Sequence, residues 1–163
     1  PSAVLSQLNT GVQHSLRQRE NHTRDGMDVA LCVVEYDKKI LHYAGANRSL
    51  WIVRNQEKES VLQEIKPTKC AIGGFTEEAQ RFVSHTIQLQ AGDAIYLHSD
   101  GFADQFGGPD GKKLMTKRFK EILISLQSVP MTNQGNQLSE SIDKWMSTGY
   151  DQVDDMLVIG VKF

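Results

Sequence analysis

The sequence predicts a single α+β domain over residues 1–163, in which helices cover mostly antiparallel sheets. Apolar residues recur at helical spacing at the start of the chain and again after residue 115. The region between holds short apolar runs separated by turn residues, which is typical of strands. A hydrophobic fraction of 39% over 163 residues is sufficient for one packed core.

The first expected element is an amphipathic helix over residues 2–20, and Pro1 suits the start of a helix. Its apolar positions recur every few residues, at Val4, Leu5, Leu8, Val12 and Leu16. The polar stretch 21–26 ends this pattern. We therefore expect one face of this helix to pack against the strands that follow.

The strands expected next lie at 29–36, 40–44, 50–54 and, more weakly, 61–65. Residues 37–39 form the turn of a hairpin. Residues 45–47 form a second turn or a bulge, because small residues and Asn tolerate unusual backbone angles. The charged stretch 55–60 is a connection.

The second half of the chain is expected to begin with a loop at 66–80, because it contains Pro67 and two adjacent glycines. Strands at 81–89 and 94–98 follow, and a short helical turn covers 102–106. The last three elements are helices at 115–127 and 134–146 and a strand at 156–161.

Two acidic signatures adjoin apolar strands. Asp100 and Gly101 follow the strand at 94–98, and Asp154 and Asp155 precede the final strand. A carboxylate at the end of a buried stretch requires a partner or a metal. Mg²⁺ and Mn²⁺ prefer oxygen ligands, so two strand-end acids that converge in the fold can hold a metal pair for phosphoryl chemistry.

With these motifs the chain resembles the metal-dependent protein serine/threonine phosphatases (PPM family) of the bacterial stage II sporulation E/RsbU type. The matching stretches, in the family's order, are DGMDVALCVVEYD (25–37), LHYAGANRSLW (41–51), GDAIYLHSDGFADQFGG (92–108) and QVDDMLVIGVK (152–162). The resemblance implies a four-layer α-β-β-α sandwich with the metal site at one end of the packed sheets. It also implies truncation at the N-terminus, because the family's first metal-binding segment lies upstream of the first helix and is not found here.

The same resemblance implies roles for individual residues. Asp100 and Asp154 are expected to be catalytic, as ligands in a two-metal site for Mn²⁺ or Mg²⁺. Asp155 supports the site beside Asp154, and Gly101 permits close backbone approach. Asp25 is a candidate for an auxiliary metal.

Each role has a plainer alternative. Asp100 could cap the following helix, and Asp154 could be a solvated residue at the start of a strand. Asp25 and Asp28 could form only a polar turn around Gly26, and this is the favoured interpretation of that pair.

Other residues near these motifs are assigned structural roles. Ser99 is not expected to be a nucleophile, because no base is spaced with it in a recognisable pattern, and His98 is expected to be a sheet residue. The glycine-rich stretch 107–111 lacks the ending of a nucleotide-binding loop, so it is expected to be a mobile turn. Lys112 and Lys113 are expected to be solvated, with contact to a phosphoprotein as the alternative.

Composition narrows the class of protein. A net charge of −2 without a basic stripe argues against nucleic-acid binding. The sequence has no apolar run long enough to span a membrane and no signal-peptide pattern at its start. Cys32 and Cys70 lack metal spacing and are expected to be reduced thiols. A cytoplasmic location is therefore expected.

The resemblance implies hydrolysis of phosphoserine or phosphothreonine on a signalling partner, such as an anti-sigma-factor antagonist. It also implies an upstream sensor or response-regulator region. The alternative is a catalytically silent module that binds a partner or forms a homodimer through an exposed sheet edge. A phosphohydrolase acting on small molecules is a third possibility.

Overall fold

The computed structural model describes residues 1–21, 24–56, 59–77 and 79–163. The chain forms two compact units, one built from Pro1–Leu50 with Glu64–Ala91 and the other from Trp51–Gln63 with Gly92–Phe163. The stretches expected at 21–26, 55–60 and 66–80 each include positions outside the described ranges, namely 22–23, 57–58 and 78.

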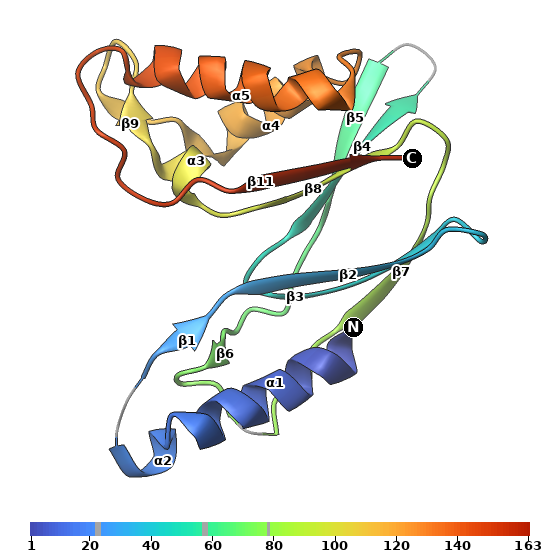
Figure 1. Cartoon of the computed structure of the whole chain (residues 1–163), viewed down its shortest axis with the longest axis vertical. Coiled ribbons are helices and arrows are strands. Elements are labelled where there is room, and N and C mark those ends of the chain that lie inside the picture. The colour runs from blue at the N-terminus through green and yellow to red at the C-terminus, as the bar shows by residue number, and fades with distance from the viewer. Residues whose placement is uncertain (22–23, 57–58, 78) are drawn as a thin grey trace. The chain divides into compact units, whose positions relative to one another are not determined.

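The first unit contains a three-stranded antiparallel sheet in the order β2-β3-β7 (Figure 1). Its strands are β2 (Val29–Glu35), β3 (Ile40–Ala46) and β7 (Ser84–Gln88). The hairpin turn predicted at 37–39 is confirmed, and Lys39 takes the left-handed conformation there, with φ 53°. A second antiparallel pair joins β1 (Gly26–Met27) to β6 (Ile72–Gly73). Strand β6 lies within the stretch 66–80, which the sequence predicted to be a loop.

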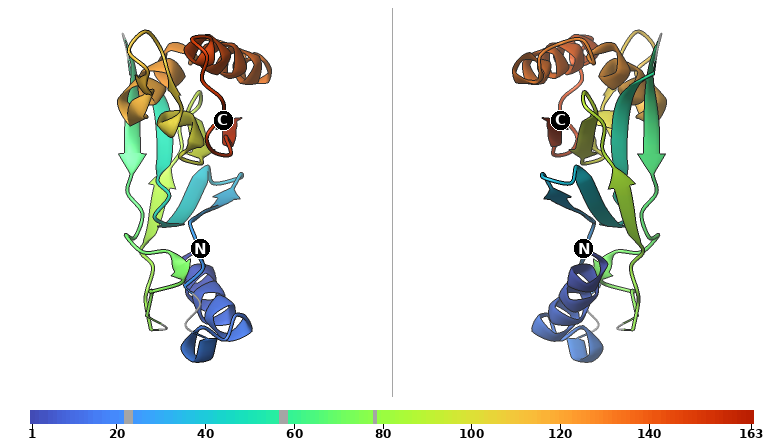
Figure 2. Two further views of the ribbon diagram at one scale, coloured as in Figure 1. Left: turned by 90° about the vertical axis from the view of Figure 1, so that its left-hand side faces the viewer. Right: turned by 90° about the vertical axis from the view of Figure 1, so that its right-hand side faces the viewer.

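The helix predicted over 2–20 is wrong in its length, because it divides into α1 (Ser2–Ser15) and α2 (Gln18–Asn21). Arg17 breaks it with a φ of 46°. The break lets the buried Gln18 side chain donate to the Asp25 carbonyl and accept from the Gly74 N–H. Figure 2 shows α1 in blue beside the short green strand β6, with which it is in contact.

Only part of the apolar stripe of α1, namely Leu5 and Val12, lies on its buried face. Leu5 and the polar Asn9 are buried, whereas Val4, Leu8 and Leu16 are exposed. Asn9 satisfies its amide by donating to the Glu77 carbonyl and accepting from the Gly73 N–H. Apolar packing by Leu5 and Val12 and the long-range hydrogen bonds of Asn9 therefore lie on the same, inward side of this helix.

The second unit is organised by a four-stranded sheet in the order β11-β8-β4-β5. Its strands are β4 (Leu50–Gln56), β5 (Glu59–Ile65), β8 (Ala94–His98) and β11 (Val158–Lys162), and β8 is antiparallel to both β4 and β11. The helices are α3 (Gly101–Asp104), α4 (Met115–Ser125) and α5 (Met131–Met146). Their apolar faces join the sheet in one core that includes Trp51, Tyr96, Phe119, Leu123 and Ile142.

Some boundaries differ from the sequence predictions. Helix α5 begins at Met131, directly after Pro130, rather than at residue 134. The stretch 107–111 lies in a short antiparallel hairpin of β9 (Phe106–Gly107) and β10 (Lys112–Lys113). The α+β class with mostly antiparallel sheets is confirmed. In the described part of the chain, no helix has the length and apolar character that crossing a membrane requires.

Candidate metal centre

Asp100 lies in the turn that joins strand β8 to helix α3. Its backbone is at the N-cap of α3, and its carbonyl accepts a hydrogen bond of 2.9 Å from the Asp104 N–H. Its carboxylate makes no capping hydrogen bond with that helix. The alternative role for Asp100, in which its side chain caps the following helix, is therefore not observed.

Asp154 and Asp155 lie in the exposed segment that leads from α5 to β11. The Asp155 N–H donates to Asp154 Oδ1 at 2.7 Å, and the Gln152 side chain donates to the Asp154 carbonyl at 2.8 Å. The first contact orients the Asp154 carboxylate, and the second holds the Asp154 backbone.

The fold brings the two acidic signatures onto adjacent segments of the second unit. Strand β11 pairs with β8 so that Val158 lies opposite His98, and the Ser99 N–H donates to the Leu157 carbonyl at 3.0 Å. Gly101 lies so close to the acidic segment that an added Cβ would be 2.4 Å from the Asp155 carbonyl oxygen. Only glycine fits beside Asp100 at this contact.

The end of β8 is supported by a cluster of aromatic rings. The His98 ring lies 3.9 Å from the Trp51 ring and 5.4 Å from the Phe119 ring, measured between centroids. Phe102, on α3, stacks on Phe119 at 4.4 Å. These contacts are those of a packed sheet residue, as the sequence predicted for His98. His98 precedes Asp100 and Phe102 follows it, so the aromatic contacts hold the turn on both sides of Asp100.

Asp25 and Asp28 belong to the first unit. Asp28 accepts a hydrogen bond of 2.9 Å from the Asn47 side chain and forms an ion pair of 3.2 Å with Arg48. Asn47 itself takes a left-handed φ of 56°. Asp25 is exposed, and its carbonyl accepts the hydrogen bond from Gln18. A metal role for Asp25 stays a prediction.

The chemistry of the second unit's acidic pair fits Mn²⁺ or Mg²⁺. Asp100 and Asp154 offer carboxylates, and the backbone carbonyls beside Gly101 offer further oxygen atoms, which are the donors that hard divalent cations prefer. Over the residues that the structure describes, no group of three or more His, Cys, Asp or Glu side chains is gathered as an ion site. The structure therefore provides two acidic segments rather than a complete ligand set.

Two residues beside this pair were not recognised as site residues from the sequence. The sequence predicts only that Ser99 is not a nucleophile, yet its hydroxyl donates to the Asp155 carbonyl at 2.7 Å and accepts from the Leu157 N–H at 2.9 Å. Gln105 was not singled out, although it is completely buried. The sequence signal that could have identified Gln105 is its polar amide side chain, which lies between Asp104 and Phe106 directly after the Asp100 motif.

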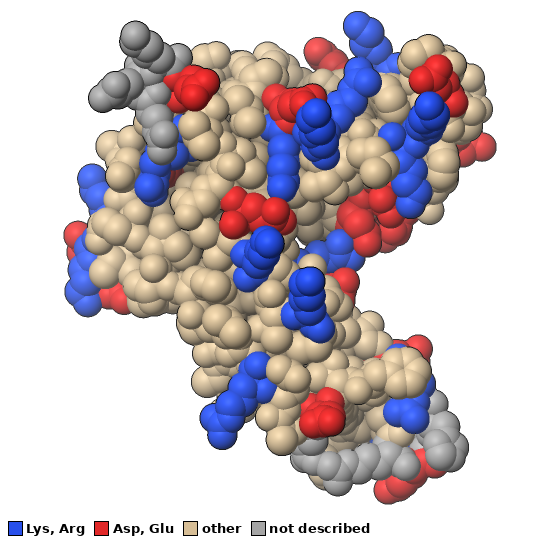
Figure 3. Space-filling view, turned by 180° about the vertical axis from the view of Figure 1, so that it is seen from behind, with Lys and Arg blue, Asp and Glu red and all other residues tan. Residues whose placement is uncertain are grey.

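Charge on the surface is mixed where it can be seen. On the face shown in Figure 3, Lys and Arg side chains are interspersed with Asp and Glu. Near α3, Lys113 forms an ion pair of 3.1 Å with Asp104, and Lys112 lies 3.6 Å from Asp110. These two lysines are thus engaged with neighbouring carboxylates.

The model of the family described as stage II sporulation protein E (SpoIIE) matches residues 1–163. Among solved structures, the SiaA-PP2C domain of Pseudomonas aeruginosa is similar to this chain, with 26% identity and a TM-score of 0.85 over 100% of this chain and 61% of that one. Among proteins with curated descriptions, none matches.

Two further structures share the fold. The phosphatase domain of SpoIIE from Bacillus subtilis, presoaked with Mn, has 17% identity and a TM-score of 0.60, over 94% of this chain and 63% of that one. The catalytic domain of the serine/threonine phosphatase PstP, in complex with 2 manganese ions, has 16% identity and a TM-score of 0.56, over 93% and 64%. The chain spans about three fifths of the length of each of the three relatives.

Proposed function

Because this chain belongs to the stage II sporulation protein E family, we propose that it forms the C-terminal portion of a metal-dependent phosphoprotein phosphatase domain. The observation that carries this proposal is the placement of Asp100 and Asp154 on adjacent segments of one unit. The reaction is hydrolysis of phosphoserine or phosphothreonine on a signalling protein, such as an anti-sigma-factor antagonist. Solved relatives that are themselves described as serine/threonine phosphatases support it.

Asp100 and Asp154 would hold Mn²⁺ or Mg²⁺, and Asp155 would orient Asp154 through the hydrogen bond from its N–H. A divalent cation held there lowers the pKa of a coordinated water and offsets negative charge on the phosphoryl oxygens. The chain's own contribution is to hold the segments that carry Asp100 and Asp154 against each other at the end of β8. An aspartate upstream of α1, which the family resemblance implies, would complete the ligand set.

Titration calorimetry with Mn²⁺ tests this proposal directly. The chain is compared with the Asp100→Asn and Asp154→Asn variants, which keep the shape of each side chain and remove its charge. Asp143→Asn, on the exposed face of α5, serves as the matched control. Weaker binding in both site variants and unchanged binding in the control is the expected result.

Hydrolysis of a phosphoserine peptide in the presence of Mn²⁺ then connects binding to activity. The two site variants should lose activity along with affinity. Equal Mn²⁺ affinity in the chain and both variants would contradict the proposed site.

The second candidate function is a partner-binding or dimerising module, and the sheet edges favour it. Among the described strands, β2 and β11 are each at the end of their sheet, and Leu157 and Ile159 expose apolar side chains along the β11 side. Sedimentation velocity distinguishes the two functions. A stable dimer with no Mn²⁺ affinity favours the module, whereas a monomer that binds Mn²⁺ favours the phosphatase.

A further inference from the structure

We propose that Ser99 and Gln105 are positioning residues that clamp the acidic loop, residues 151–157, and thereby fix Asp154 beside Asp100. Both residues come from the segment 99–105, which carries Asp100, and neither is given a metal-binding role. The inference deepens the proposed function, because the clamp matters to chemistry only if the two aspartates share a site.

Gln105 holds the first half of the acidic loop. Its side chain is completely buried, and its Nε2 donates to the Asp151 carbonyl at 2.8 Å. Its Oε1 accepts from the Val153 N–H at 3.2 Å. One amide thus satisfies a carbonyl and an N–H two residues apart, immediately before Asp154.

The backbone of Gln105 is itself fixed. Its carbonyl accepts hydrogen bonds from the Trp145 indole N–H at 3.0 Å and from the Leu114 N–H at 2.9 Å. The clamp is therefore attached to the core of the second unit through α5 and the start of α4, so it does not move with the loop that it holds.

Ser99 holds the second half of the loop. Its hydroxyl donates to the Asp155 carbonyl at 2.7 Å and accepts from the Leu157 N–H at 2.9 Å. These bonds extend the pairing of β8 with β11 past the last strand pair, which joins His98 to Val158. A single hydroxyl thereby serves as donor and acceptor immediately after Asp154.

The residues bonded to Gln105 and to Ser99 lie on either side of Asp154 in the acidic loop. Ser99 and Gln105 themselves lie on either side of Asp100 in the segment 99–105. Gly101 lets the segments touch between them, at the Asp155 carbonyl. Burying an amide is favourable only where its hydrogen bonds are met, and both ends of Gln105 are met by the loop. The loop's backbone groups therefore explain why a polar residue occupies this core position.

Amide hydrogen exchange of the full chain, measured without metal, tests the clamp itself. Gln105→Leu should speed exchange of the Val153 N–H by about tenfold or more, and Ser99→Ala should do the same for Leu157. Ser99→Thr keeps a hydroxyl at this position and should keep the slow exchange of the Leu157 N–H. Gln134→Leu is the matched control, since Gln134 is equally buried and hydrogen-bonded but lies on α5, bonded to Tyr96 and to the Leu126 carbonyl.

Titration with Mn²⁺ tests the positioning role. The loss of a residue that orients a metal ligand typically weakens affinity about 10–100-fold, and this range is expected for Gln105→Leu and Ser99→Ala. Gln134→Leu should lower the melting temperature and leave the Mn²⁺ affinity and the loop's exchange unchanged.

Two results would overturn the inference: unchanged exchange at Val153 and Leu157, or faster exchange with unaltered Mn²⁺ affinity. Failure to bind Mn²⁺ by a longer chain that includes the upstream aspartate would overturn the proposed function instead, and the exchange rates at Val153 and Leu157 alone would then test the clamp.

Discussion

Arg54 grips the buried carboxylate of Asp93 with two parallel hydrogen bonds, from Nε at 2.8 Å and from Nη2 at 2.7 Å. The Asp93 side chain is 1% exposed and that of Arg54 is 21% exposed. The hydrogen bonds to Asp93 raise the pKa of Arg54. The pair joins β4 to the turn before β8, and the Asp93 carbonyl also accepts from the Phe163 N–H.

Replacing Arg54 with Ala should strongly destabilise the second unit. The variant leaves the Asp93 carboxylate buried without its charged partner, which typically costs about 3–5 kcal/mol. Urea unfolding measures the change in the free energy of unfolding. Lys112→Ala, which removes an exposed ion pair with Asp110, should change it by less than about 1 kcal/mol. Equal effects from the two variants would show that Arg54 is not a structural partner of Asp93.

Adding one methyl group at Gly101 and at Gly135 should have opposite effects on stability. At Gly101 the new Cβ would be 2.4 Å from the Asp155 carbonyl oxygen, so Ala must push the acidic loop away. At Gly135, inside α5, no atom lies within 4 Å of the new Cβ, and Ala is favoured over Gly in a helix by about 1 kcal/mol. Thermal unfolding of both variants checks the signs, and a stable Gly101→Ala protein would contradict the close contact.

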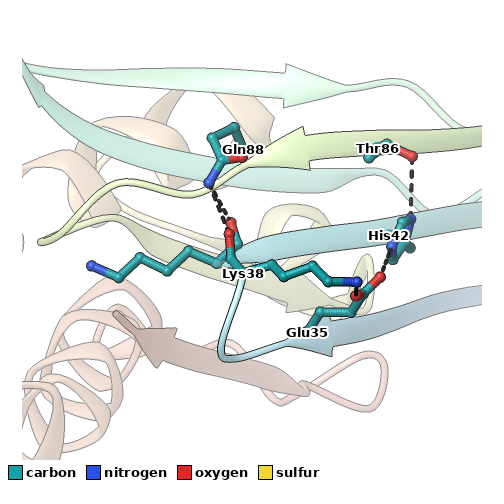
Figure 4. A network of polar contacts seen from close by, with 6 residues as sticks. Glu35, Lys38, His42, Thr86 and Gln88 are labelled. Atoms are coloured by element: carbon teal, nitrogen blue, oxygen red, sulfur yellow. Dashed lines mark hydrogen bonds and ion pairs between the residues drawn. The ribbon is translucent and has the colours of Figure 1, made fainter.

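The network around Glu35 should make stability depend on pH (Figure 4). Hydrogen bonds from Lys38 and His42, each 2.7 Å, lower the pKa of Glu35 below its usual 4.5. Since the folded-state pKa is the lower one, the ionised carboxylate stabilises the fold above the usual pKa of 4.5, and this contribution is lost as the pH falls through the folded-state pKa.

The measurement is thermal unfolding of the parent and Glu35→Gln as the pH is lowered. The parent should be more stable near neutral pH, and the difference should shrink in acid. Glu140→Gln, on the exposed face of α5, is the control that should show no such trend. A difference independent of pH would show that the ionised form of Glu35 is not the one stabilised.

Cys32 should resist thiol reagents in the folded protein. Burial raises its pKa to about 11, and burial also raises the pKa of Cys70. Because the thiolate is the reacting form, roughly one Cys32 in a thousand is ionised at pH 8, against about a quarter of free cysteines. Labelling with a disulfide reagent should therefore be about two orders of magnitude slower than in denaturant, and equal rates would contradict the burial.

Local pattern was sufficient to predict a strand in each of the two larger sheets. The apolar runs at β2 and β8 are bounded by turn residues, and the structure places both as strands. The start of α5 could not be predicted in the same way, because residues 131–136 are mostly polar. Gln134 is nonetheless buried, because its amide is hydrogen-bonded to the Tyr96 hydroxyl and to the Leu126 carbonyl. The apolar pattern around residue 134 does not show these partners.

Some residues of the candidate site could likewise be predicted from local sequence, and others could not. Asp100, Gly101 and Asp154 stand out in the sequence because they lie in family motifs beside two apolar strands. Ser99 and Gln105 act through backbone groups about 50 residues away, at Asp151 to Leu157, and a single sequence does not show which backbone groups a side chain will meet. The register of β8 against β11 gives the partners of Ser99, and the fold of the segment 151–153 over Gln105 gives the others.

Each of the two units is assembled from two separate stretches of the chain, and these stretches alternate along it. A single break anywhere in the polypeptide therefore cannot leave both units whole. Recombination between genes can exchange this region only as one block, and a protease that nicks the chain between residues 51 and 91 damages both units together.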